Sequence, residues 1–238
     1  MPPEPDSRRQ RLIHLESVDS TSAHLKRLAL GEIETGTAVL ADEQTAGYGQ
    51  RGRSWGSARH VGMYLSVLVD LPAPPTLLPL AAGLAVCEAL RHWTQEVRLK
   101  WVNDLVARRG KLGGVLVEVV RGRAIVGIGV NLHTPDVPGG IGLEALHPDP
   151  PSAKQLAVAV LSALDDRLLT WEMFGTERVR SDWLAACAHL GHEVEVEGLR
   201  GRSEGLGPAG ELLLRLENGQ HTAVISGSLR MADGTYCV

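Results

Sequence analysis

The sequence predicts an α+β protein, in which a larger body that mixes strands and helices is followed by a small all-β module. Residues 1–187 alternate between short apolar runs typical of strands and longer stretches with helical spacing. From residue 188 to 238 only short alternating runs remain, as expected for strands joined by tight turns. A chain of 238 residues can form one large and one small domain. We therefore expect domains at 1–187 and 188–238.

The first elements alternate between strand and helix. Residues 12–16 predict a short strand, and the segment after it predicts a helix. The Asp-Ser-Thr run at 19–21 contains the expected helix cap, and Gly31 is the expected stop. Residues 37–43 predict the next strand. Residues 45–57, "TAGYGQRGRSWGS", are polar and rich in glycine, so a long loop is expected there.

The central part of the chain predicts a buried helix between strands. Residues 62–71 continue the strand pattern, and residues 76–93 are apolar enough for a buried helix. Residues 97–101 predict a strand that ends at an Asn-Asp turn. Residues 111–120 and 124–132 predict a hairpin around "RGR".

The last third changes from helix to short strands. Residues 135–151 are rich in proline and glycine and predict a loop, and residues 152–187 return to helical spacing. Two later runs, residues 210–217 and 220–226, are joined by Asn218-Gly219, which is a strong hairpin signal.

Composition excludes several classes of function. The net charge of -4, and the seven acidic against four basic residues in 188–238, argue against nucleic-acid binding. The longest apolar stretch, residues 77–90, is too short to cross a bilayer, and the N-terminus lacks a secretory core. Cys87, Cys187 and Cys237 are too widely spaced to indicate a disulfide framework or a metal site. We expect a cytoplasmic protein.

Lysine is rare in this chain. Only four of the 24 basic residues are lysines, and two of these, Lys100 and Lys111, lie eleven residues apart. An ammonium group is therefore expected to be required at these two positions. Lys26 and Lys154 are interpreted as solvated surface lysines.

The polar loop carries candidate ligand-binding groups. Its glycines allow backbone N–H groups to approach an anion, and Arg51 and Arg53 add charge-assisted hydrogen bonds. Trp55 offers a stacking surface for a base such as adenine. The alternative is a flexible surface loop, since the spacing matches neither a Walker motif nor a dinucleotide fingerprint.

Two further segments could contribute to a site. Lys100 lies at a strand end, where Asp104 could steady it, although Asn103-Asp104 could also be an ordinary turn. In "VGIGVN", Gly127 and Gly129 leave one strand face bare, as if a flat ligand lay on it. Asn131 could then bind an amide or base edge, or it could be a buried asparagine bonded to backbone.

The order of these motifs is more specific than any one of them. The chain carries "DST", "EQTAGYGQRGRSW", "KWVND", "KLGG" and "GIGVN" in this order. Together they resemble the biotin protein ligase family, whose hallmarks are a GRGRxGRxW loop and a KWPND turn. The resemblance covers nearly the whole chain. It implies a mixed β-sheet flanked by helices, related to class II tRNA synthetases, with a C-terminal SH3-like β-barrel.

The resemblance also implies an activity. Such a monofunctional ligase, without the DNA-binding domain of repressor-type members, joins biotin to ATP as biotinyl-5′-AMP. It then biotinylates a lysine of a biotin carboxyl carrier domain, here expected in acetyl-CoA carboxylase. Mg²⁺ is expected with the triphosphate, since no protein cage for a metal is visible. The hairpin over residues 119–127 offers a candidate edge for a homodimer.

Site residues follow from the matching motif positions. The catalytic residues would be Lys100, Arg53 and Lys111, supported by Asn103 and Asp104. The biotin-binding residues would be Ser20, Thr21, Ser22, Gln44, Gly47, Tyr48, Gly49, Gln50, Lys100 and Gly114. The ATP- or adenylate-binding residues would be Gln50, Arg51, Arg53, Trp55, Lys111 and Asn131. The loop is expected to be ordered by ligand and to shield the acyl-adenylate from water.

Three departures from the family pattern bear on the expected site. Val102 stands in place of the proline of KWPND, Ser22 in place of a common asparagine, and Gln50 in place of an arginine. Gln50 lacks the ionic part of a charge-assisted hydrogen bond, so we expect weaker retention of the intermediate unless Arg51 compensates. Two alternatives stay open, a lipoate–protein ligase and a non-catalytic biotin or nucleotide sensor.

Overall fold

The computed structural model describes residues 11–233, 235 and 236, which form two β-sheets and three α-helices. The large sheet has the order β1-β2-β3-β7-β6-β5-β4. Strands β1 and β2 are parallel and all other pairs are antiparallel, so the predicted mixed sheet is confirmed. The strands are β1 (Leu12–Leu15), β2 (Ala38–Ala41), β3 (Gly62–Asp70), β4 (Arg98–Lys100), β5 (Asp104–Ala107), β6 (Gly110–Val120) and β7 (Arg123–Asn131).

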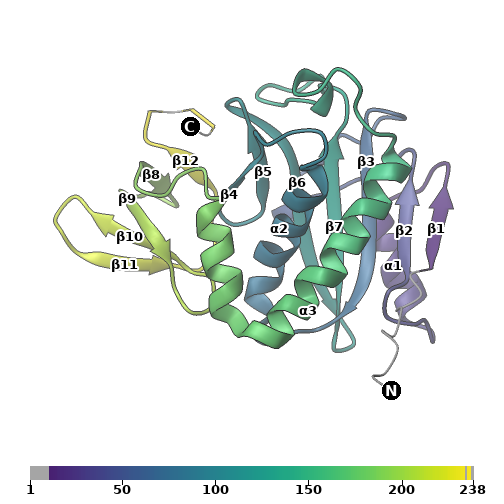
Figure 1. The fold of residues 1–238 in the computed structure, drawn as a ribbon, viewed down its shortest axis with the longest axis horizontal. Helices are drawn as coiled ribbons and strands as arrows, with labels where there is room; N and C mark the ends of the chain where they lie inside the picture. Colours follow the sequence, from purple (N-terminus) through teal and green to yellow (C-terminus); the bar gives the residue numbers. More distant parts are fainter. Residues whose placement is uncertain (1–10, 234, 237–238) are drawn as a thin grey trace.

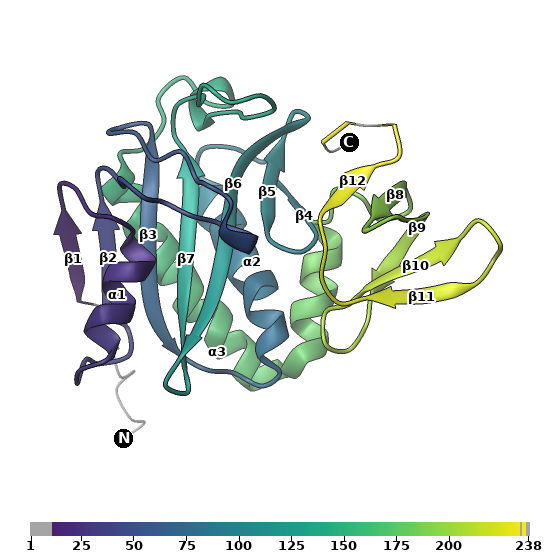
Figure 2. The same ribbon diagram turned by 180° about the vertical axis from the view of Figure 1, so that it is seen from behind.

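Helices cover both faces of this sheet. Helix α1 (Thr21–Ala29) lies on one face, and α2 (Leu78–Leu90) and α3 (Ala153–Ala185) lie on the other (Figures 1 and 2). The Ser20 side chain caps α1 by accepting a hydrogen bond from the Ala23 N–H, so the predicted cap is confirmed.

Two of the predicted helices differ from expectation, one in its start and one in its continuity, for reasons of local sequence. The stretch 76–93 begins as a 3-10 turn at Pro75–Leu77, and α2 itself is shorter. Helix α3 begins next to the predicted start at residue 152, where Ser152 and Gln155 form a capping box that the sequence analysis did not predict, and it is broken at Gly175, which has φ 77°. A side chain with Cβ is strained at that angle, so glycine permits the break.

Alternation along β7 separates the core from the site. Val126, Ile128 and Val130 are buried in the main core beneath α2 and α3. Gly127 and Gly129 point to the opposite face, because successive strand residues alternate in direction. That face also carries α1, and in Figure 2 the chain between β2 and β3 crosses in front of β3 and β7.

The C-terminal module is a five-stranded antiparallel sheet with the order β11-β10-β9-β8-β12. Its strands are β8 (Glu193–Val196), β9 (Leu199–Leu206), β10 (Leu212–Leu216), β11 (His221–Val224) and β12 (Leu229–Met231). The predicted all-β character and the Asn218-Gly219 hairpin are confirmed. The expected closed barrel is wrong, because β11 and β12 form opposite edges of this sheet in the described chain. Residues 227 and 228 between them line a cavity instead.

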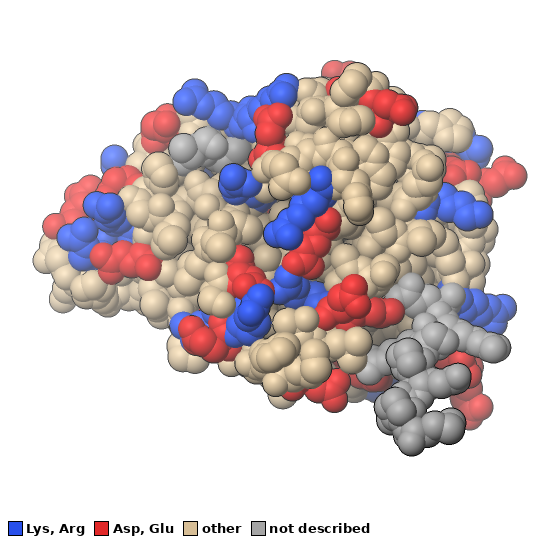
Figure 3. Space-filling model, viewed as in Figure 1, with Lys and Arg blue, Asp and Glu red and all other residues tan. Residues whose placement is uncertain are grey.

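Surface charge is mixed over the face that carries α2 and α3. Acidic and basic side chains alternate there without an extended basic area (Figure 3). Within the described part of the chain, no helix has the length and apolar character needed to cross a membrane.

Candidate functional site

A cavity of about 640 Å³ lies between the glycine face of the large sheet, the chain from residue 44 to 56, and residues 227–230, 235 and 236. The predicted site residues that line it are Ser20, Thr21, Ser22, Gln44, Tyr48, Gly49, Gln50, Arg53, Trp55, Lys100, Asn103, Asp104, Lys111, Gly114 and Asn131. Gly47 and Arg51 belong to the same loop but lie outside this lining. The structure therefore brings together residues that are more than 100 positions apart in the sequence.

The predicted loop is a folded hairpin in this structure. The Trp55 N–H donates to the Gly47 carbonyl at 2.9 Å, and the Gly49 N–H donates to the Arg53 carbonyl at 2.8 Å. Its tip is a 3-10 turn over Gln50–Gly52. A Cβ atom on Gly47 would lie 2.8 Å from the Trp55 carbonyl oxygen, which is closer than real contacts allow. Glycine at 47 therefore permits the two arms to pack.

A network of uncharged polar groups forms one end of the cavity. The Thr21 hydroxyl and the Ser22 hydroxyl lie 2.8 and 2.9 Å from the Ser66 hydroxyl. The Gln44 amide oxygen accepts from the Thr21 N–H at 2.8 Å, and its amide nitrogen donates to the Ser57 hydroxyl at 2.8 Å. Neutral donors and acceptors in this density suit a polar but uncharged ligand group.

Sequence analysis missed Ser66. It is fully buried in β3, between the apolar residues Leu65 and Val67. A single serine inside an otherwise apolar strand was the available signal, because a buried hydroxyl needs a hydrogen-bonding partner.

A charged cluster forms a second part of the cavity. Lys111 Nζ lies 2.6 Å from Asp104 Oδ1, and Lys100 Nζ lies 3.5 Å from Asp104 Oδ2. Burial raises the pKa of Asp104, but the positive charges of Lys111 and Lys100 outweigh it and the net pKa is lowered. Two ammonium groups and one carboxylate leave a net charge of +1, which favours an anionic ligand.

Tyr236 completes this cluster from the C-terminal segment. Its hydroxyl donates to Asp104 Oδ2 at 2.5 Å, and its ring centroid lies 3.1 Å from Lys100 Nζ. Lys100 is only 3% exposed. Sequence analysis missed Tyr236, because the segment after β12 carries no strand or helix pattern to place it.

The glycine face of β7 is covered by the protein itself. A Cβ atom on Gly129 would lie 2.7 Å from the Trp55 ring, and one on Gly127 would lie 2.6 Å from the Ser22 hydroxyl. Lys111 Nζ is 5.4 Å from the Trp55 ring centroid. The Trp55 Nε1 is buried and has no hydrogen-bond partner among the described residues. Glycine is therefore needed on β7 to seat this ring, and stacking of Trp55 on adenine stays a prediction.

Two amide side chains are held by backbone groups at the cavity. The Asn131 amide donates to the carbonyls of Lys111 and Ile141, each at 3.2 Å. The Asn103 amide donates to the Val115 carbonyl at 2.7 Å. These bonds match the simpler interpretation of Asn131 as a residue satisfied by backbone, and they fix the turn that follows Lys100.

The tip of the loop is held by the C-terminal sheet. Arg51 forms an ion pair of 2.8 Å with Glu197, and Arg53 donates to the Ser228 hydroxyl at 3.0 Å. Hydrogen bonding from Arg51 lowers the pKa of Glu197. The two arginines predicted to contact phosphate groups are thus positioned by residues from outside the motif.

The turn that carries Lys100 is also fixed from the C-terminal side. The Trp101 N–H donates to His189 Nε2 at 3.1 Å, and the Trp101 Nε1–H donates to the Gly210 carbonyl at 2.9 Å. His189 Nδ1 lies 2.9 Å from the Ser203 hydroxyl in β9. The peptide bond between Trp101 and Val102 is cis.

Comparison with known proteins gives consistent matches. The profile of the biotin/lipoate A/B protein ligase family matches residues 14–134. A biotin–[acetyl-CoA-carboxylase] ligase of Mycobacterium tuberculosis is 34% identical, over 87% of this chain and 83% of that protein. One of Paracoccus denitrificans is 31% identical, over 84% of this chain and 92% of that protein.

The fold comparison agrees with these matches. The biotin protein ligase of Aquifex aeolicus, solved with biotin and ATP, superimposes with a TM-score of 0.82 and 31% identity. The match covers 94% of this chain and all of that chain.

Proposed function

Because the chain belongs to the biotin/lipoate A/B protein ligase family, we propose that it activates biotin with ATP and transfers it to a carrier lysine. The observation that carries this proposal is one cavity holding both a neutral polar network and a cluster with net positive charge. Both similar bacterial proteins are named ligases for acetyl-CoA carboxylase. The biotin carboxyl carrier domain of that enzyme is therefore the proposed acceptor.

The first step joins two anions. An oxygen of the biotin carboxylate attacks the α-phosphorus of ATP, a new P–O bond forms, and the bond to the β-phosphate breaks to release pyrophosphate. Lys100 and Lys111 offset the repulsion between the reactants and stabilise negative charge on the α-phosphate. Asp104 holds both ammonium groups in place, so little reorganisation is needed when charge develops.

The neutral network serves the other end of biotin. Thr21, Ser22 and Gln44 supply hydroxyl and amide groups that match the donors and acceptors of a ureido ring. In the second step the carrier lysine amine attacks the acyl carbon of biotinyl-5′-AMP. A C–N bond forms, the bond to the phosphate oxygen breaks, AMP leaves, and the amine gives up a proton.

Mg²⁺ is part of this proposal as the partner of the triphosphate. Within the described residues, no three His, Cys, Asp or Glu side chains are grouped to hold a metal. Asp104 is bound to Lys111 and Lys100 and is poorly suited to an additional cation. The described residues thus fit a Mg²⁺ ion that is bound mainly by phosphate oxygens, which is a common arrangement for this ion.

We also propose the finer features that the family implies. These are a catalytic domain at residues 1–187 on a class II synthetase-like scaffold, and an SH3-like module at 188–238 that is open rather than a closed barrel. Helix α3 ends at Ala185 and β8 begins at Glu193, which supports this boundary. A cytoplasmic location, absence of DNA binding, and a homodimer through the β6–β7 hairpin are further proposals. Light scattering coupled to gel filtration tests the dimer.

Turnover tests the proposed function. The protein is incubated with ATP, Mg²⁺, biotin and a biotin carboxyl carrier domain, and a streptavidin blot reads the product. We expect labelling by the wild type and by Lys154→Met, whose lysine is exposed on α3. Lys100→Met should abolish labelling. Transfer of lipoate but not biotin would identify a lipoate ligase, and biotin binding without turnover would identify a sensor.

A further inference from the structure

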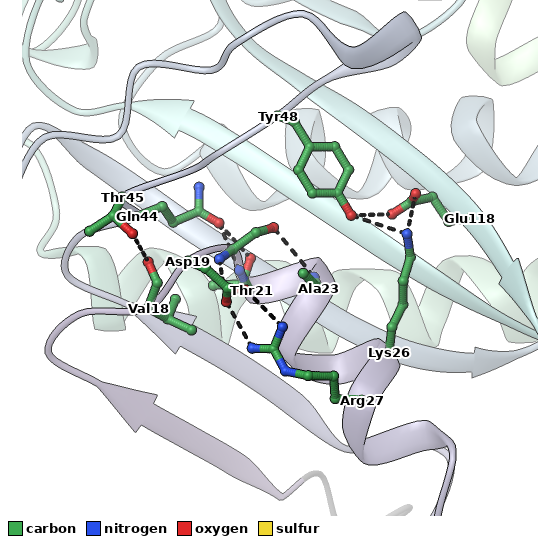
Figure 4. Close-up of polar contacts among 11 residues, drawn as sticks. Val18, Asp19, Thr21, Ala23, Lys26, Arg27, Gln44, Thr45, Tyr48 and Glu118 are labelled. Atoms are coloured by element: carbon green, nitrogen blue, oxygen red, sulfur yellow. Dashed lines mark hydrogen bonds and ion pairs between the residues drawn. The ribbon is translucent and has the colours of Figure 1, made fainter.

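Figure 4 shows that three side chains from three separate elements meet beside the hairpin. The Tyr48 hydroxyl donates to Glu118 Oε2 at 3.0 Å and accepts from Lys26 Nζ at 3.1 Å. Lys26 Nζ also lies 2.5 Å from Glu118 Oε1. Tyr48 comes from the hairpin, Glu118 from β6 and Lys26 from α1, so this triad ties the hairpin to the body of the protein.

Lys26 is not the solvated surface lysine that its sequence context indicated. Burial lowers the pKa of Lys26, but its bonds to Glu118 and Tyr48 outweigh this, and the net pKa is raised. The ammonium therefore stays charged at physiological pH. Hydrogen bonds donated by a charged ammonium are stronger than bonds between neutral groups.

Because Tyr48 lies within one arm of the hairpin, the triad can restrain the position of the loop. Tyr48 lies between Gly47 and Gly49 and pairs across the hairpin with Ser54. Gly47 is tightly packed against the other arm, and the Gly49 N–H is bonded to the Arg53 carbonyl. Fixing the Tyr48 hydroxyl therefore fixes this arm of the hairpin. Gln50 and Arg53, a few residues further along, line the cavity.

We propose that Tyr48, Glu118 and Lys26 form a latch that holds the hairpin closed over the cavity. Tyr48 is then a positioning residue that determines how long the cavity retains its acyl-adenylate. This inference rests on the proposed function for the identity of the retained ligand. Tyr48 lines the cavity, whereas Glu118 and Lys26 do not, so the latch can be separated from direct ligand contact by mutation.

The first test measures release of biotinyl-5′-AMP from preloaded enzyme by chase with excess biotin and ATP. Tyr48→Phe keeps the ring and removes the hydroxyl, and Glu118→Leu removes the acceptor without touching the cavity. We expect each variant to release the ligand about five- to tenfold faster, as for loss of one hydrogen bond of ordinary net strength. The double variant should be no faster than the faster single variant, because both changes break one unit.

A matched control removes a comparable bond elsewhere. The Thr35 hydroxyl donates to Asp70 at 2.8 Å on the exposed surface, and neither residue lines the cavity. Thr35→Val should leave the release rate unchanged. If Tyr48→Phe accelerates release while Glu118→Leu does not, Tyr48 acts by direct ligand contact and the latch is refuted.

The second test does not depend on the identity of the ligand. Trypsin needs a locally unfolded segment, so the rate of cleavage after Arg51 or Arg53 reports how often the hairpin opens. We expect cleavage there to be about five- to tenfold faster in both latch variants, and unchanged in Thr35→Val. Equal cleavage rates in wild type and Tyr48→Phe would overturn the latch, even in a protein that activates biotin. Faster cleavage of the latch variants, together with a wild type that forms no biotinyl-5′-AMP, would instead overturn only the proposed function.

Discussion

His189 should make the stability of this protein depend on pH below neutrality. Its side chain is 1% exposed. Nε2 accepts the Trp101 N–H, so the proton of the neutral ring is on Nδ1 and is donated to the Ser203 hydroxyl. A second proton would have to lie on Nε2, where it would face the Trp101 N–H. Burial, followed by the charges of Lys100 and His192, lowers the pKa of His189 to about 3.

The size of this effect follows from proton linkage. In the unfolded chain the pKa of His189 returns to its ordinary value of 6.5. Between pH 6.5 and about 3 the unfolded state binds a proton that the folded state does not bind. The contribution to stability is therefore complete above pH 6.5 and is lost as pH falls. Each pH unit below 6.5 costs about 1.4 kcal/mol, so the loss at pH 5 is about 2 kcal/mol.

Urea unfolding at pH 7, 6 and 5 measures this dependence. In His189→Gln the amide can still accept from Trp101 and donate to Ser203, but it does not titrate. We expect the variant to be less stable than the wild type at pH 7, and to lose about 2 kcal/mol less between pH 7 and 5. His92→Gln, at an exposed position whose charge is not among those that lower the pKa of His189, should keep the wild-type slope. An identical slope in His189→Gln and wild type would refute the reasoning.

Three further predictions concern the cavity. Lys100→Arg should fold but release pyrophosphate about a hundredfold more slowly, as for loss of one preorganised donor, whereas near-normal release would contradict a need for ammonium. Gln50→Arg should release biotinyl-5′-AMP about two- to fivefold more slowly, since a charge-assisted bond is stronger. An unchanged rate would mean that Arg51 already compensates. Tyr236→Ala should tighten ATP binding in calorimetry about three- to tenfold, because the ring competes with anions for Lys100. Weaker binding would instead identify Tyr236 as a support for the lysine.

Much of the candidate site could be predicted because its chemistry lies in short motifs with local structural causes. Gly47 permits the arms of the loop to pack, and Gly129 seats the Trp55 ring. Asn103 bonds to the Val115 carbonyl and closes the turn after Lys100. At each of these positions the local backbone requires glycine or a side-chain amide, and few other residue types could take its place. The motif is therefore recognisable in a single sequence.

The contribution of the C-terminal segment could not be predicted. Tyr236, Glu197 and Ser228 reach the site through tertiary contacts that span more than 100 residues. Such contacts leave no periodic pattern, because each depends on how two separately formed sheets pack. The open C-terminal sheet could not be predicted for the same reason, since the sequence indicates short strands but not which strand edges will pair.

The strength of these long-range contacts differs, and this decides which cations can move. Arg51 and Glu197 are both about half exposed, and such surface pairs contribute little to stability. Lys100 is 3% exposed and Asp104 is 14% exposed, and breaking such a largely buried pair leaves a charge without compensation, which costs several kcal/mol. Lys100 is therefore fixed before any ligand arrives, whereas Arg51 can leave Glu197 at small cost. Gln50 thus lies next to the one arginine of the loop that is paired with a carboxylate among the described residues, and that pair is weak enough to exchange for a phosphate.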